Sequence, residues 1–171
     1  MIDFSVFRRF WIEVKYKFYG IKNIFIWIPV LLEDRQWDHS FLLVILRKKL
    51  SLMEKFFRTK GNHVGAEKDA DNIKTAICLL DRLLKDDYME SAFVPHKKKY
   101  GESTMVWEEI PDMPKSVKMD IKYENQPVTE EEKKKERELF LRCMNKEDYL
   151  RKQDLIYLFK HLEKHLFGWW D

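Results

Sequence analysis

Two histidines near the end of the chain have the type and spacing of metal ligands. His161 and His165 are four positions apart, so on a helix they share one face and could both reach one Zn²⁺ ion. The segment lacks the metalloprotease order, in which a glutamate directly follows the first histidine. A third ligand would have to come from a distant segment, such as Asp38, His39 or Asp81. We therefore keep a zinc site as a minor alternative and expect no cofactor.

Motifs for covalent catalysis are missing from the sequence. Cys78 and Cys143 are the only cysteines, and neither belongs to a paired CxxC or another cysteine signature. There is no nucleophile elbow and no glycine-rich phosphate loop. Two distant cysteines within helical patterns indicate reduced thiols, as in cytosolic proteins. The sequence therefore favours a protein that is not an enzyme.

A set of cationic and aromatic residues could bind a nucleotide, since lysine and arginine attract phosphates and aromatic rings stack on bases. The candidates are Arg47, Lys48, Lys49, Arg82, Trp107 and Trp169. The cations of segment 39–60 do not share one narrow face, however, and the net charge of the chain is only +3. The scattered cations and the nearly neutral net charge argue against nucleic acid as a partner. A solvated helix face explains the same residues without any ligand.

Length and composition favour a helical domain. The chain has 171 residues, enough for one domain to bury a core without a disulfide or a metal. Glycine and proline contribute five residues each, which disfavours a turn-rich all-β fold, and charged residues reach 36%, which is typical of helices with solvated faces. The longest apolar run, residues 24–32, is too short to span a bilayer. We also expect no secretory signal after Met1.

Hydrophobic periodicity predicts one domain, residues 1–171, that is mainly α. The predicted segments are an aromatic amphipathic helix at 4–32, a basic helix at 38–60, and further helices at 66–88 and 129–167. Segment 89–128 holds four of the five prolines, so we expect a loop or a small β-hairpin there, with strands near 104–107 and 116–121. The expected architecture is an irregular bundle of about four helices with this excursion at 89–128.

Three local signals predict where helices begin and end. Asp38 is suited to cap the basic helix, and Gly61 is suited to end it. Thr129 and Glu132 have the spacing of a capping box, in which each side chain accepts a backbone hydrogen bond. We expect the last helix to start at this box and to end near Gly168.

The helix at 4–32 has the clearest amphipathic pattern, with apolar residues at alternating steps of three and four. These are Phe4, Phe7, Trp11, Val14, Phe18, Ile21, Phe25 and Ile28. We expect this stripe to dock on the core of the domain, with a partner chain or a membrane surface as the alternatives. Further aromatic residues lie off the stripe, and the extra apolar surface favours self-association.

Charged and aromatic residues late in the chain lead to two further expectations. Acidic residues at positions 81, 86 and 87 should form ion pairs with the basic helix, because a partly buried charge needs a partner. At least one of Trp169 and Trp170 should be mostly buried, because a tryptophan ring is too apolar to remain in water.

Several runs of this sequence resemble a set of small uncharacterised proteins encoded by tailed bacteriophages. The runs are Ile21–Ile24, Trp27–Pro29, Asp34–His39, Lys49–Leu50, Met53–Phe57, Ile73–Lys74, Leu80–Arg82, Asp86–Tyr88 and Gly168–Asp171. The resemblance covers most of the chain outside 89–128. It implies a viral accessory protein in the cytoplasm of a bacterial host, and it transfers no catalytic or binding residue.

We therefore expect a non-enzymatic phage accessory protein that acts through protein contact and associates with itself or with a host or phage protein. The first alternative is an anti-defence protein that sequesters or degrades a nucleotide signal through the cationic and aromatic candidates. Weaker alternatives are nucleic-acid binding and peripheral membrane association through the helix at 4–32.

Overall fold

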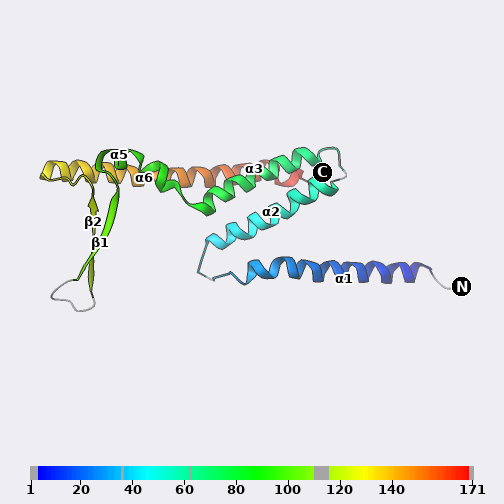
Figure 1. The fold of residues 1–171 in the computed structure, drawn as a ribbon. Coiled ribbons are helices and arrows are strands. Elements are labelled where there is room, and N and C mark those ends of the chain that lie inside the picture. The colour runs from blue at the N-terminus through cyan, green and yellow to red at the C-terminus, as the bar shows by residue number, and fades with distance from the viewer. Residues whose placement is uncertain (1–3, 36, 62, 110–115, 170–171) are drawn as a thin grey trace.

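The computed structural model describes residues 4–35, 37–61, 63–109 and 116–169. Within these ranges the chain is mainly α, with one two-stranded antiparallel sheet (Figure 1). The helices are α1 (Phe4–Leu31), α2 (Ser40–Lys60), α3 (Ala66–Lys85), α4 (Tyr88–Ala92), α5 (Val94–Tyr100) and α6 (Glu130–His165). The strands are β1 (Ser103–Glu109) and β2 (Val117–Tyr123), and a 3₁₀ turn, η1 (Leu166–Gly168), follows α6. The predicted mainly α fold with a small hairpin inside 89–128 is confirmed.

The segment at 89–128 is more regular than the sequence predicts. α4 and α5 precede the hairpin, and Pro95 lies in the first turn of α5, where a missing N–H removes no helical hydrogen bond. α1 continues through Pro29 to Leu31, although proline is expected to end or kink a helix. α3 ends at Lys85 because Asp86 adopts a left-handed backbone conformation with φ 49°.

The predicted cap of α6 is confirmed. The Thr129 hydroxyl accepts a hydrogen bond from the Glu132 amide at 3.2 Å, and the Glu132 carboxylate accepts one from the Thr129 amide at 3.0 Å. At the start of α2, His39 rather than Asp38 occupies the cap position, so the predicted cap at Asp38 is wrong by one residue. The Asp38 carboxylate still accepts a hydrogen bond from the Ser40 amide at 2.9 Å. Hydrogen bonds from the Ser40 hydroxyl and amide lower the pKa of Asp38. Both acidic side chains satisfy backbone donors that the first turn of a helix leaves without partners.

Gly61 ends α2, as predicted, and allows the close approach of α3. A Cβ atom at this position would lie 2.5 Å from the Cβ of Ala66 and 2.5 Å from the carbonyl oxygen of Phe57. Neither Ala66 nor the end of the α2 backbone can move away easily, because Ala66 and Phe57 are both buried. The turn between α2 and α3 therefore requires glycine for space rather than for an unusual backbone angle.

The main core lies where α2, α3 and the second half of α6 meet (Figure 1). α3 supplies most of its buried side chains, because its apolar residues face both neighbouring helices. The core consists of Leu50, Phe57, Ala70, Ile73, Ala76, Ile77, Leu80, Leu83, Leu158, Leu162 and Trp169. Burial of Trp169 confirms the expectation that a terminal tryptophan folds back onto the domain; Trp170 lies outside the described residues.

The first half of α6 carries a second, smaller cluster made by Ala92, Phe93 and Cys143. This cluster joins α4 and α5 to α6 and lies beside the hairpin, in which Trp107 pairs with Met119. Cys143 is buried, whereas Cys78 is exposed, and both thiols are free. None of the described helices combines the length and the apolar character that a membrane span requires.

Candidate functional site

The apolar stripe of α1 is exposed on the described surface. We define the α1 stripe as Val14, Phe18, Ile21, Phe25 and Ile28, all of which are exposed. Phe18 and Phe25 each remain 71% exposed. Figure 1 shows α1 lying apart from the main core, beside α2. The side chains of Phe4 and Phe7, which the sequence places on the same stripe, lie outside the described residues.

The expectation that this stripe docks on the core was wrong. The partly covered residues of α1 are Ile26, Trp27 and Val30, which lie on the opposite side of the helix from the stripe, given 3.6 residues per turn. Periodicity shows which residues share a face of a helix, but not which of two apolar faces the rest of the chain covers. α1 has apolar residues on both sides, and its stripe faces solvent.

The α1 stripe has the spacing of a coiled-coil core. Its residues occupy alternating a and d positions of a heptad, with Phe18 and Phe25 at a. The flanking e and g positions include Lys15, Lys17 and Lys22, which are exposed. A strict a/d pattern forms a narrow band that one second helix can cover. The stripe therefore has the width of a coiled-coil seam, and its flanks are positively charged.

A buried carboxylate joins α3, α4 and α6. Asp154 is only 2% exposed, and its Oδ2 atom accepts a hydrogen bond from the Tyr88 hydroxyl at 2.6 Å and pairs with the Arg82 guanidinium at 2.9 Å. Because a buried charge is costly without partners, these two contacts stabilise the junction of the three helices. We call Arg82, Tyr88 and Asp154 the helix junction.

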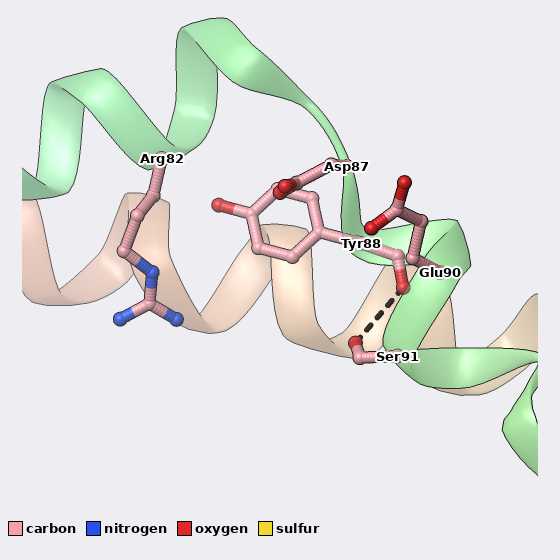
Figure 2. A pocket seen from close by; sticks show the side chains of 5 residues that line it. All are labelled: Arg82, Asp87, Tyr88, Glu90 and Ser91. Carbon is pink, nitrogen blue, oxygen red and sulfur yellow. Dashed lines mark hydrogen bonds between the residues drawn. The ribbon is translucent and has the colours of Figure 1, made fainter.

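A cleft of about 400 Å³ opens beside the helix junction and is lined by Arg82, Asp87, Tyr88, Glu90 and Ser91 (Figure 2). Figure 2 shows the Tyr88 ring between Arg82 and the start of α4, with the Ser91 hydroxyl donating to the Tyr88 carbonyl oxygen at 3.0 Å. Burial and the hydrogen bond to Asp154 raise the pKa of Tyr88. The phenol therefore stays protonated and acts as a donor rather than as a base, which suits a structural contact.

A second buried polar pair lies beneath the hairpin. His96 is 3% exposed, and its Nε2 atom lies 2.8 Å from Glu136 Oε1. The rings of Tyr100 and Tyr123 each lie 5.0 Å from the His96 ring, measured between centroids, and a cavity of about 330 Å³ adjoins them. Burial and a hydrogen bond with Glu136 raise the pKa of Tyr123. The pair anchors β2 to α5 and α6; its partners are 40 positions apart, so no local pattern predicts it.

One of the predicted ion pairs with the basic helix is present, and the other two acidic residues pair with residues outside α2. Asp81 pairs with Arg47 of the basic helix, as expected. Asp86 pairs instead with Arg151 of α6 at 2.8 Å, and Asp87 pairs with Lys85 at 2.6 Å. The negative charges at the end of α3 are therefore compensated mostly by residues from outside α2.

The structure does not bring the predicted nucleotide-binding residues to one site. Arg47 and Arg82 are held by Asp81 and Asp154, while Lys48 is half-buried and Lys49 is exposed on α2. Trp107 is exposed on the hairpin, whereas Trp169 is buried in the main core. β1 lies beside the start of α6, whereas η1, which directly precedes Trp169, follows the end of α6 (Figure 1), so these two rings cannot sandwich one base.

His161 and His165 do share one face of α6, and their ring centroids lie 4.6 Å apart. The Nε2 atom of His161 lies 2.8 Å from the carbonyl oxygen of Asn72, so it carries a proton and donates to that oxygen. This hydrogen bond occupies one of the two nitrogens that could bind a metal. Within the described ranges, no group of three or more His, Cys, Asp or Glu side chains is arranged to hold a metal ion.

Comparison of the chain with protein-family models, curated proteins and solved structures finds no match. The resemblance to bacteriophage proteins and the placement in a host cytoplasm stay predictions.

Proposed function

We propose that this protein acts through protein contact rather than catalysis and that it self-associates through the α1 stripe. The observation that carries the proposal is the exposure of five heptad-spaced apolar side chains on one face of a 28-residue helix. A second copy of α1 supplies the same spacing, so a two-fold axis near Phe18 and Ile21 lets each stripe cover the other.

The exposed area supports a stable interface. A phenylalanine side chain contributes about 200 Å² of surface, so Phe18 and Phe25 together leave about 300 Å² uncovered, and the aliphatic members bring the stripe to roughly 500 Å². The largest apolar patch on a typical monomer measures about 300–600 Å², and a standard interface covers about 800 Å² per partner. The α1 stripe lies in the upper part of the range for monomers, which favours its burial against a partner.

Electrostatic repulsion between the lysines of two copies does not outweigh the burial of apolar surface. Two stripes would bury about 1000 Å² of apolar surface, the main favourable contribution to association, which must exceed a cost of about 4–15 kcal/mol for lost freedom of motion. Like-charged pairs among Lys15, Lys17 and Lys22 of two copies would each oppose association by only about 0.2–0.5 kcal/mol. The apolar contribution therefore exceeds the repulsion of the flanks, which acts mainly on the salt dependence of association.

Two substitutions on the same helix test the proposal. Phe18→Glu places a carboxylate on the stripe, whereas Tyr16→Glu places one on the opposite side at a residue of matched exposure, 73% against 71%. Light scattering with size-exclusion chromatography should show a concentration-dependent dimer for the unmodified chain and for Tyr16→Glu, and a monomer for Phe18→Glu. Equal behaviour of the two variants contradicts the proposal.

Vesicle flotation separates self-association from membrane binding. With vesicles of anionic phospholipid, the self-associated protein should remain with the unbound fraction, because its stripe is already covered. Flotation that is lost in Phe18→Glu and kept in Tyr16→Glu would show instead that a membrane covers the stripe.

The phage accessory role belongs to the same proposal and rests on the sequence resemblance alone.

A further inference from the structure

A cleft of about 620 Å³ lies where α3 begins and α6 ends, on elements other than α1. Its charged and titratable lining consists of His63, Lys68, Asp69, Lys164 and His165. These residues come from the α2–α3 turn, the first turn of α3 and the last turn of α6. The volume falls within the range of about 300–1000 Å³ that is usual for small-molecule sites.

The positive charges in this cleft exceed the negative ones. Among the described residues that line it, Asp69 is the only acidic one, and Asp69 Oδ2 lies 2.8 Å from His63 Nε2, so this carboxylate already has a partner. Within the described ranges, neither Lys68 nor Lys164 forms an ion pair with a carboxylate. Two ammonium groups and the His165 ring therefore border one cleft without a counterion among the residues that the structure describes.

We propose that this cleft binds an oxyanion of the phosphate type between Lys68 and Lys164, with His165 as a third donor. Hydrogen bonds from cationic donors to phosphate oxygens are about twice as strong as those between neutral groups. The cleft is larger than a single phosphate group needs, so a phosphorylated small molecule is the class of ligand that fits it. Gly65, which also lines the cleft, precedes α3 without a side-chain cap, and helix amino termini favour anions.

The titration of His165 is consistent with an anion site. Burial lowers its pKa, and the nearby positive charges of His161, Lys164 and Lys68 lower it further, while Asp69 opposes them. His63 of the α2–α3 turn lines the same cleft. An anion held among these groups would stabilise protonated His165 and raise its pKa. By linkage, the anion should then bind more tightly as the pH falls through the pKa of His165.

The test follows the imidazole resonances of the full chain by NMR as inorganic phosphate or pyrophosphate is added at constant ionic strength, with sodium chloride as the balancing salt. We expect saturable shifts of the His165 resonances and a rise in the His165 pKa when the anion is present. His39 and His96, which lie outside the cleft, should not shift. An equal response to chloride alone, or the absence of saturation, would overturn the proposal.

Charge-removing variants test which residues hold the anion. Lys68→Gln and Lys164→Gln should each weaken phosphate or pyrophosphate binding by roughly fivefold to tenfold, the loss expected for one charge-assisted hydrogen bond at a partly exposed site. Lys160→Gln is the matched control, because Lys160 is exposed one turn earlier on α6 and does not line the cleft. Equal weakening by all three substitutions would indicate non-specific attraction and contradict the assigned site.

Discussion

Removal of one hydroxyl group tests the helix junction. Tyr88→Phe deletes the donor whose oxygen lies 2.6 Å from the buried Asp154 carboxylate and leaves the ring in place. Asp154 keeps its contact with Arg82 at 2.9 Å, so the carboxylate retains one partner. A hydrogen bond to a charged group contributes about 1.5–3 kcal/mol to the free energy of unfolding. For a chain of this size, that loss lowers Tm by roughly 3–12 °C.

The assay is urea unfolding followed by far-ultraviolet circular dichroism, which reports the loss of helix. Tyr157→Phe is the matched control, since Tyr157 is 52% exposed on α6 and its hydroxyl contacts only Gln153, at 3.3 Å. We expect the control to change the free energy of unfolding by less than about 0.5 kcal/mol. If Tyr88→Phe is as mild as Tyr157→Phe, the reasoning about the buried carboxylate is refuted.

A double-mutant cycle assigns the effect to the contact itself. Tyr88→Phe and Asp154→Asn are measured separately and together, and residues in direct contact show coupling energies of about 0.5–3 kcal/mol. We expect a coupling near the middle of that range. Additive losses would mean that the two side chains stabilise the protein independently.

Three further predictions concern the core, the hairpin and the cap of α6. Trp169→Ala should lower the free energy of unfolding by about 3–5 kcal/mol in the same urea assay, because it removes a large buried side chain. Trp169→Phe should lower it by much less. The buried indole N–H has no acceptor among the described residues, so its removal recovers part of the loss. The pKa of Tyr123 in the folded state is raised above its ordinary value of 10.0. The contribution of Tyr123 to the free energy of unfolding is therefore fully present below about pH 10 and is lost as the pH rises. Tyr123→Phe should reduce the loss of stability that urea titrations measure at alkaline pH. Hydrogen bonds from the backbone amides of Thr129 and Val128 lower the pKa of Glu132 from 4.5. The contribution of Glu132 to stability is therefore present above pH 4.5 and is lost as the pH falls through the lowered pKa. Glu132→Gln should reduce the change of helix content with pH on the acid side, measured by circular dichroism.

The sequence predicts the local parts of this fold well. The Thr129 capping box, the stop at Gly61 and the two strands of the hairpin depend on residues within a few positions of each other, and all are present. Trp169 is buried as expected, because a large apolar ring gains free energy by leaving water. These features follow from backbone hydrogen bonding and from side-chain type.

The sequence does not predict which apolar face is covered. Leu155, Leu158, Leu162 and Leu166 follow one another at steps of three and four along the end of α6 and the start of η1, but only Leu158 and Leu162 are buried. The reason is that α3 covers a band of α6 narrower than the apolar surface that α6 carries. For the same reason, the sequence does not predict that the α1 stripe faces solvent.

Long-range pairs are the other part that sequence reasoning misses. The Tyr88–Asp154 contact spans 66 positions and the His96–Glu136 contact spans 40. No periodicity links such residues, and each looks like an ordinary solvated side chain in its own segment. The cationic cleft likewise forms only when the start of α3 meets the end of α6.

Sedimentation equilibrium of the unmodified chain at low and high sodium chloride tests the proposed self-association most directly. The account predicts a mass of twice the chain mass of 21.0 kDa and association that strengthens with salt, because screening weakens the repulsion between the lysines that flank the two stripes. A mass of 21.0 kDa at every concentration, or association that weakens as salt is added, would contradict the claim that a second copy covers the α1 stripe.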